Sequence, residues 1–331
     1  MRRDTLNPYI GHDSQVYRME EHRLVGGRGD GMRLLEISNG KGLELTVSPD
    51  RCADIARLSY RGINMSYFSP CGYVAPAYYD DKEDGWLKSF TAGYLTTCGL
   101  RSVGTPSTDE GIRYPLHGTI ANTPAEYCRW QESEDGKELI VHAVVKDEQI
   151  FGSKLRLTRE LKVSTEKNEF RICDVIENTG DREEGIEILY HMNMGYPLLD
   201  EDSVIDIPSS EVKPRDDHAA EDIANWNQII RPEAGYVERC YYHRFPDRKG
   251  RAAIWQPKLG QGLEITFDAG ELDGFVEWKM MGVRDYVLGL ECGNCYPDGR
   301  DVMRRTGMLK QLAPGAKKEY CMTVRMLDSW K

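Results

Sequence analysis

The chain has 331 residues, 40% of them hydrophobic, and a formal net charge of −11 at pH 7. A chain of this length can bury a large core, and β-sandwiches of this size fold as one domain, so the length does not require two. The acidic balance argues against nucleic acid and anionic membrane surfaces as partners, because both bind clustered Lys and Arg. No apolar run approaches the roughly 20 residues that a membrane span needs.

The predicted elements, taken in chain order, are almost all β-strands. We expect residues 1–30 to form an N-terminal arm and a hairpin. The strands predicted at 32–38 and 43–47 flank Asn39-Gly40, a dipeptide typical of tight hairpin turns. Apolar and polar residues alternate along the later segments. These later strands are predicted at 139–145, 155–163, 170–176, 186–190, 263–267, 287–291 and 320–326.

Helical periodicity is weak throughout the chain. Only residues 86–95 and 219–230 have a spacing that predicts short helices. Many short strands separated by turn residues favour an antiparallel sandwich or barrel. Because no internal repeat or long linker interrupts the pattern, we predict one all-β domain over residues 1–331.

Cysteine usage indicates the compartment. The nine cysteines are scattered without the spacing of a disulfide framework, which is typical of reduced thiols in a cytoplasmic protein. The two arginines at the N-terminus have no apolar segment behind them, so we expect no signal peptide. Cys292 and Cys295 form a lone CxxC after a predicted strand. Since no second CxxC completes a zinc site, we interpret them as ordinary thiols.

The segment 286–292 carries the first candidate functional group. Tyr286, Leu288 and Leu290 alternate with a second face that ends in Glu291. A carboxylate at the end of an apolar strand is costly to bury, so Glu291 either caps the strand at the surface or is paired or used. Gly289 neighbours it on the same face. We expect this glycine to leave open space beside the carboxylate, which suits a ligand.

Two histidines also lie in apolar company. His117 sits between Leu116 and Gly118, where it is either a satisfied core histidine or a site residue. His191 and Asn193 alternate with two methionines, so both polar side chains share one strand face. The other five histidines lie among charged or turn residues and are expected at the surface.

A third polar stretch follows the second predicted strand. Arg51 and Asp54 lie close together where that strand runs into a turn. We expect them to form a structural ion pair or to contact a substrate.

One glutamate and one histidine suffice to exchange the anomers of a sugar. The glutamate becomes a better base when it is partly desolvated, and a histidine can give or take a proton at pH 7. A base removes the proton of the C1 hydroxyl while an acid protonates the ring oxygen, so the ring opens and recloses on the other face. This chemistry requires no cofactor and no metal.

Two alternatives stay open at this point. His117, His191 and Glu291 could instead ligate a metal in a sugar isomerase or lyase, although closely spaced ligands such as HxH are absent. The same pocket could also belong to a non-catalytic carbohydrate-binding protein. No Ser–His–Asp motif or phosphate-binding loop is present in the sequence.

The order of the short motifs resembles the aldose 1-epimerase (galactose mutarotase-like) superfamily, and in particular a poorly characterised branch of unknown function. The resemblance spans roughly residues 30–327. It is carried by Asp50-Arg51, Asp54-Ile55, Trp86-Leu87, the run from Leu95 to Arg101, Leu116-His117-Gly118, Tyr190-His191-Met192-Asn193, Glu277-Trp278-Lys279 and Gly289-Leu290-Glu291.

The resemblance implies a large antiparallel β-supersandwich with a site in its concave face. It implies that Glu291 is the base for the C1 hydroxyl and that His191 protonates the ring oxygen. His117 would bind and orient the sugar, and Arg101 falls near a substrate-binding arginine. The pocket is further expected to include Asn193, Arg51, Lys279 and Trp278.

Two features depart from the superfamily pattern. An HxY motif is replaced by His191-Met192-Asn193, and the aspartate that grips the sugar stays open among Asp206, Asp216 and Asp217. These departures concern the identity of the sugar more than the type of reaction. A small-molecule sugar is the expected partner, and the formation of a homodimer stays open.

Overall fold

The computed structural model describes residues 7–330. This part of the chain contains 24 strands, two short α-helices and six short 3-10 helices, which confirms the predicted all-β class. Of the predicted N-terminal arm, residues 1–6 lie outside the described residues. The rest includes the 3-10 helix η1 (Asp13–Gln15) and the strand β1 (Arg18–Arg23). No helix in residues 7–330 combines the length and the apolar character that crossing a bilayer demands.

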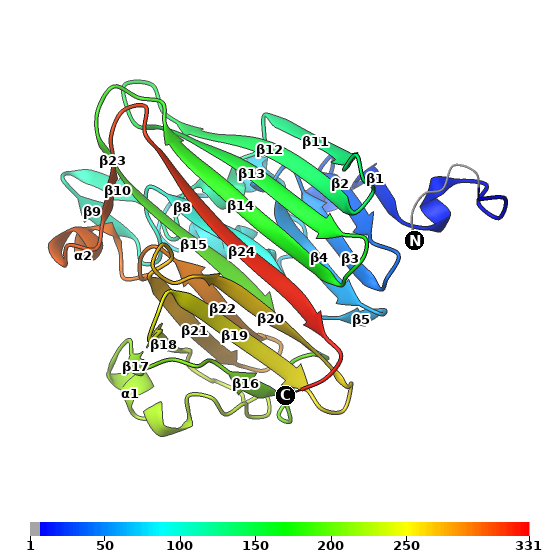
Figure 1. Cartoon of the computed structure of the whole chain (residues 1–331). Coiled ribbons are helices and arrows are strands. Elements are labelled where there is room, and N and C mark those ends of the chain that lie inside the picture. The colour runs from blue at the N-terminus through cyan, green and yellow to red at the C-terminus, as the bar shows by residue number, and fades with distance from the viewer. Residues whose placement is uncertain (1–6, 331) are drawn as a thin grey trace.

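The largest sheet has eight strands. The C-terminal strand β24 lies between β14 and β20, so the end of the chain joins two hairpin runs that precede it (Figure 1). In spatial order the strands are β11 (Tyr127–Glu132), β12 (Glu138–Glu148), β13 (Lys154–Ser164), β14 (Glu169–Asn178), β24 (Lys317–Leu327), β20 (Gln261–Asp268), β19 (Lys249–Gln256) and β16 (Val204–Asp206).

The second large sheet has seven strands and carries the site described below. Its central strand β15 pairs with β22, β23 and β8. The strands are β17 (Glu211–Pro214), β18 (Arg239–Arg244), β21 (Gly274–Met281), β22 (Tyr286–Gly293), β15 (Glu184–Met194), β23 (Lys310–Leu312) and β8 (Leu95–Leu100).

The remaining elements form smaller sheets and connections. A five-stranded sheet consists of β1, β2 (Arg33–Ser38), β3 (Leu43–Ser48), β4 (Asp54–Tyr60) and β5 (Ile63–Asn64). Two-stranded sheets pair β6 (Tyr67–Phe68) with β7 (Ala92–Gly93), and β9 (Ser107–Asp109) with β10 (Ile112–Tyr114). The helices are η2 (Gly27–Gly29), η3 (Pro76–Tyr78), η4 (Gly85–Ser89), η5 (Ile120–Asn122), η6 (Ile223–Asn225), α1 (Asp217–Ala220) and α2 (Arg300–Arg305).

The predicted strands are confirmed, whereas the helix predictions were partly wrong. The segment predicted at 219–230 holds only the end of α1 and the single turn η6. Of 86–95, only the first residues are helical, because Leu95 already begins β8 and pairs with β15. The helix α2 was not predicted, since its residues directly follow a Pro-Asp-Gly turn.

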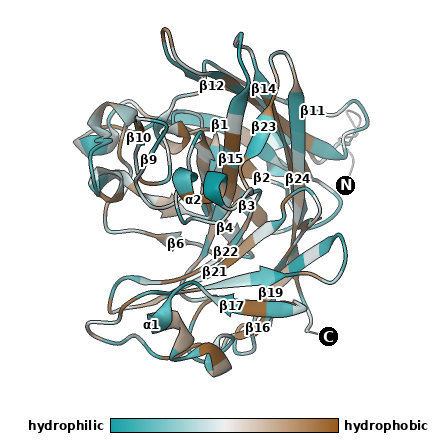
Figure 2. Ribbon diagram, turned by 90° about the vertical axis from the view of Figure 1, so that its left-hand side faces the viewer, coloured by the Kyte–Doolittle hydropathy of each residue, from teal (hydrophilic) through white to brown (hydrophobic). Residues whose placement is uncertain are grey.

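Successive side chains of a strand point to opposite faces of the sheet, so the apolar residues are divided between two regions. Hydrophobic and hydrophilic segments alternate along the long strands in Figure 2. Tyr190 and Met192 of β15, with Leu288 and Leu290 of β22, belong to the main core, which also contains apolar residues of the eight-stranded sheet. The other face of β15 and β22 therefore points away from this core. A second apolar cluster, including Trp86 and other residues from η4 to α2, lies on that face.

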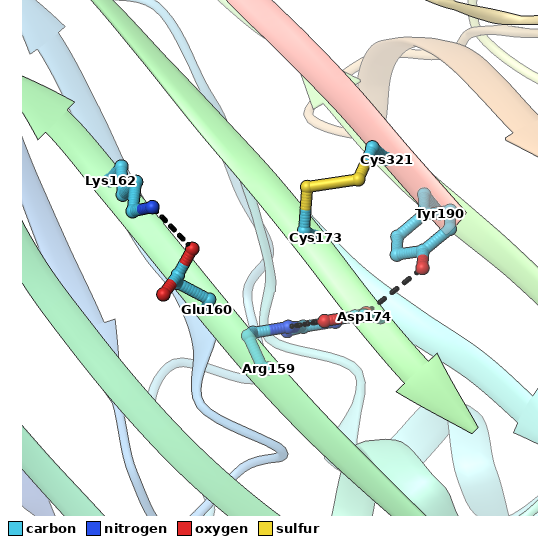
Figure 3. The surroundings of a disulfide bond; sticks show 7 residues. All are labelled: Arg159, Glu160, Lys162, Cys173, Asp174, Tyr190 and Cys321. Atoms are coloured by element: carbon cyan, nitrogen blue, oxygen red, sulfur yellow. Dashed lines mark hydrogen bonds and ion pairs between the residues drawn. A yellow bond between two sulfur atoms is a disulfide. The ribbon is translucent and has the colours of Figure 1, made fainter. Parts of the chain in front are cut away.

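A buried ion network joins the three large sheets. The guanidinium of Arg159 lies 2.7 Å from carboxylate oxygens of both Asp54 and Asp174. Figure 3 shows Arg159 beside Asp174, to which the Tyr190 hydroxyl also donates at 2.9 Å. Asp54 also accepts from the backbone N–H of Thr97 at 2.7 Å. Asp54 thus has a different partner from the one expected from sequence, because Arg159 reaches it from β13 of the eight-stranded sheet.

Two cysteines correct the expectation of nine reduced thiols. Cys173 of β14 and Cys321 of β24 stand directly opposite each other in the antiparallel register and form a disulfide (Figure 3). The sequence concealed this pair because 148 positions separate the two residues. The other seven cysteines are free, and Cys292 and Cys295 are buried.

Candidate active site

Strand register builds the floor of a cavity of about 250 Å³ on the outer face of the seven-stranded sheet. Val276 of β21 stands opposite Glu291 of β22. His191 of β15 lies opposite Glu291 of β22. This follows from the register of the two strands, in which Tyr190 pairs with Cys292 and Asn193 pairs with Gly289. All three side chains line the cavity. The sequence predicted the faces on which Glu291 and His191 lie, and the register brings these two side chains together.

Glu291 and His191 touch each other at the bottom of this cavity. The His191 Nε2 atom lies 3.3 Å from Oε1 of Glu291, and the two side chains are 6% and 2% exposed. No sugar ring fits between them, because they are cross-strand neighbours on adjacent strands and their side chains start only a few ångströms apart. A ligand can approach the pair only from the open side of the cavity.

Burial shifts both groups toward their uncharged forms. It raises the pKa of Glu291 well above its ordinary value, and Glu238 acts in the same direction while Arg215 opposes it. It lowers the pKa of His191 to about 4, an effect that the Asn193 side chain partly opposes. Burial therefore disfavours the charged form of each group, and so it disfavours an ion pair between them.

Gly289 serves the carboxylate rather than a ligand. A Cβ atom at this position would meet Oε1 of Glu291 at 2.3 Å and Cβ of Trp278 at 3.1 Å. The space that we expected to hold a ligand is thus occupied by the Glu291 side chain itself. The glycine lets the Glu291 carboxylate lie back along β22 over position 289, which pairs with Asn193 of β15.

Gly289→Ala is therefore expected to keep the fold and to displace the carboxylate. The severe clash involves the end of the flexible Glu291 side chain, and Cβ of Trp278 needs to shift by only a few tenths of an ångström, so the unfolding transition should change little. A shift of the acid by about 1 Å can cost up to about 100-fold in rate. Thermal unfolding together with steady-state kinetics would check this result, and a variant with full activity would contradict the placement of Glu291.

His117 forms one wall beside the pair. Its ring lies 4.6 Å from that of Trp86 and 5.6 Å from that of His191, measured between centroids. The backbone N–H of Gly104 donates to its Nδ1 at 3.3 Å, which places the proton of the neutral ring on Nε2. Burial, with a smaller contribution from His191, lowers the pKa of His117 to about 3. The ring can therefore donate a hydrogen bond without carrying charge.

The mouth of the cavity is polar. The Trp278 indole Nε1 donates to Oε2 of Glu238 at 2.7 Å, and the guanidinium of Arg215 lies 3.8 Å from the other oxygen of that carboxylate. Arg215 also lies 3.6 Å from Asp216. Trp86 and Phe90, stacked at 4.5 Å, form an apolar wall that also lines the cavity. Aromatic walls with a few polar groups are typical of small-molecule sites.

The structure does not bring every predicted residue into the cavity. The guanidinium of Arg101 packs on the Tyr114 ring, with the Arg101 carbon Cζ 5.1 Å from the ring centroid, and lies outside the lining. Asn193 is fully buried behind His191, and its amide donates to the His191 carbonyl at 2.9 Å. Asn193 therefore positions the histidine instead of contacting a ligand.

Arg51 and Lys279 are structural as well. Arg51 donates to the carbonyls of Ala121 and Val74 at 2.6 and 2.9 Å, away from the cavity. Lys279 follows Trp278 on β21 and so points to the opposite face. Its ammonium donates there to three carbonyls, those of Asn225, Trp226 and Gln228.

The predicted sugar-gripping aspartate is not found among the three candidates. Asp206 pairs with Arg251 at 2.5 Å, Asp216 caps the N-terminus of α1, and Asp217 is the first residue of that helix. In the described part of the chain, the carboxylates that line the cavity belong to Glu291 and Glu238. Sequence reasoning missed Glu238 and Arg215 because each lies at a strand end among charged residues, with no local apolar signal.

The metal-ligand hypothesis finds no matching geometry in this cavity. His117, His191 and Glu291 do not place their ligating atoms within 4.8 Å of one another, whereas one other group in residues 7–330 does. The nearest approach in the cavity is the contact between His191 and Glu291.

Comparison with known proteins agrees with this fold. A proposed aldose 1-epimerase from Klebsiella pneumoniae subsp. pneumoniae is 28% identical, with a TM-score of 0.89 over 95% of this chain and 84% of that one. A galactose mutarotase-like protein from Clostridium acetobutylicum (12% identity, TM-score 0.68, 95% and 99% coverage) shares the fold. So does a galactose 1-epimerase from Lactobacillus acidophilus (12% identity, TM-score 0.61, 95% and 100% coverage). No curated protein matches the chain.

These observations define the class as a galactose mutarotase-like β-sandwich protein. Residues 29–326 match the model of the family described as a domain of unknown function, DUF4432. The chain belongs to this family, an uncharacterised branch of the aldose 1-epimerase superfamily.

Proposed function

We propose that this protein is an aldose 1-epimerase-like isomerase that exchanges the anomers of a sugar. The observation that carries the proposal is the contact between His191 Nε2 and Glu291 Oε1, 3.3 Å apart on the floor of an aromatic-walled cavity. Such a pair holds a proton donor and a proton acceptor side by side. The likeness to a proposed aldose 1-epimerase supports the same reaction class.

The direct contact suits the reaction because the two reacting oxygens are also neighbours. In a cyclic sugar the C1 hydroxyl oxygen and the ring oxygen are bonded to the same carbon. One member of the pair can therefore remove the hydroxyl proton while the other protonates the ring oxygen, with the sugar lying over both. The ring opens, C1 rotates, and the reverse transfers close the ring as the other anomer.

We propose that Glu291 and His191 exchange the roles that the resemblance implied. Glu291 as base and His191 as acid require an ion pair, and burial disfavours both charges. In the uncharged form, Glu291 gives its proton to the ring oxygen and His191 accepts the hydroxyl proton. The two side chains are then charged only while the sugar ring is open, and closure of the sugar ring returns both to their uncharged forms.

The pH dependence follows from the pKa of His191. The imidazole accepts a proton only while it is neutral, and its pKa of about 4 keeps it neutral as the pH falls to that value. We expect kcat/KM to be flat between about pH 5 and 7, with no inflection near 6.5, the pKa of an unperturbed histidine. A clear limb near pH 6.5 would contradict the uncharged resting form.

The function is tested with a panel of free sugars. Saturation-transfer NMR measures anomer exchange directly and should show acceleration over buffer for at least one member of the panel. Calorimetry should also detect the binding of that sugar to the cavity, whose mouth is lined by Trp278 and Glu238. Binding of a sugar without faster exchange would instead identify a carbohydrate-binding protein.

A further inference from the structure

A second cluster of reactive side chains lies away from the cavity, on the eight-stranded sheet. Sγ of Cys173, Sγ of Cys321 and a carboxylate oxygen of Glu319 all lie within 4.8 Å of one another. Cys321 and Glu319 are two residues apart on β24, so they share a face, and Cys173 stands opposite Cys321 on β14. The cluster therefore results from the register of β14 and β24 and shares no residue with the lining of the cavity.

The cluster is open to solvent. Both cysteines are only partly buried and Glu319 is exposed. Cys321 also lines a surface groove with Arg171 and Thr323. This accessibility distinguishes the pair from the buried free thiols such as Cys292 and Cys295. A reductant and a cation can both reach these sulfur atoms.

We propose that, once its disulfide is reduced, this cluster is a binding site for a thiophilic divalent cation such as Zn²⁺. A small-molecule or protein dithiol supplies two electrons and two protons to the Cys173–Cys321 bond and is itself oxidised to a disulfide. The two thiols then lose their protons as the cation binds both sulfur atoms and the Glu319 carboxylate. The site is available only in the reduced protein.

The ligand set fits the chemistry of zinc. Thiolates and carboxylates are ordinary zinc ligands, and soft thiolates favour zinc over magnesium or calcium. Ligand atoms lie about 2.0–2.3 Å from zinc, so atoms that start within 4.8 Å of one another converge by side-chain rotation. Three protein ligands leave one position for water, as in open zinc sites.

Charged side chains of both signs lie near the cluster, and Arg171 and Arg248 line the same groove as Cys321. Glu160 of β13 stands opposite Cys173, and its carboxylate pairs with Lys162 at 2.7 Å and lies 3.6 Å from His142. Figure 3 shows the pair of Glu160 and Lys162 beside the disulfide. Glu160 already has two partners, so we assign the third ligand to Glu319.

Cobalt is the probe for the experiment, because Co²⁺ bound to thiolates absorbs in the near ultraviolet and visible range. The full-length protein is reduced with a phosphine, desalted without oxygen and titrated with Co²⁺, and Zn²⁺ is then added as competitor. We expect one Co²⁺ per chain in the reduced protein, displaced by Zn²⁺, and none in the oxidised protein. Reduced protein without thiolate–cobalt absorption would overturn the proposal.

Variants separate this cluster from the other thiols. Cys173→Ser and Cys321→Ser should abolish the absorption, whereas Glu319→Gln should keep it and weaken affinity about 10-fold or more. Cys128→Ser is the matched control, since Cys128 is a half-buried free cysteine of the same sheet. Absorption that persists in the Cys173→Ser/Cys321→Ser protein would contradict the assignment. Circular dichroism checks that each variant is folded.

Discussion

Glu291→Gln is expected to abolish most of the catalysed anomer exchange while leaving the fold intact. Glutamine has nearly the same shape as the carboxyl but can neither give nor take a proton, so His191 loses the proton-transfer partner that lies 3.3 Å away. General acid–base catalysis by a positioned side chain contributes about 10²–10⁴-fold, and we expect a loss in this range. Saturation-transfer NMR with the best sugar of the panel measures the loss.

The control for this variant is another buried glutamate of the same sheet. Glu187 of β15 is fully buried, and its Oε2 accepts from the backbone N–H of Val103 at 2.7 Å, outside the cavity. Glu187→Gln should therefore retain the wild-type rate. If Glu291→Gln exchanged anomers as fast as Glu187→Gln, the proposed chemistry would be wrong.

Arg159→Met is expected to give the largest loss of stability. Arg159 is 1% exposed and neutralises Asp54 and Asp174, which are 5% and 0% exposed. Burial already raises the pKa of Asp54, and Arg159 opposes this effect. Removal of one partner from a buried ion pair costs about 3–5 kcal/mol. This is a large part of the roughly 5–15 kcal/mol that holds a typical domain folded.

Urea unfolding followed by circular dichroism tests this prediction. Arg248→Met is the comparison, because Arg248 pairs with Asp268 and Glu271 at the surface, where its loss should leave the transition nearly unchanged. If uncompensated charge causes the loss, Arg159→Met/Asp54→Asn/Asp174→Asn should recover part of it. Equal transitions for Arg159→Met and Arg248→Met would show that the network contributes little.

Local alternation in the sequence was enough to predict the strands and to choose the histidines. The period of two placed His191 with Asn193 and Glu291 with Gly289 on common faces, and the registers of β15 and β22 agree with both assignments. The same rule, applied to Lys279 beside Trp278, shows that the two cannot share the cavity. Their neighbouring positions in the sequence were misleading, because adjacent strand residues point to opposite sides.

The sequence by itself determined the all-β class and the positions of most strands, and it singled out Glu291, His191 and His117, which line the cavity, since each leaves a local pattern of polarity. Only the tertiary structure decided which groups meet. Glu291 contacts His191, Arg215 and Glu238 share the mouth of the cavity, Arg159 reaches Asp54, and Cys173 joins Cys321. These contacts depend on the register between strands and on the packing of one sheet on another. Such pairings link distant parts of the chain, so no local spacing records them.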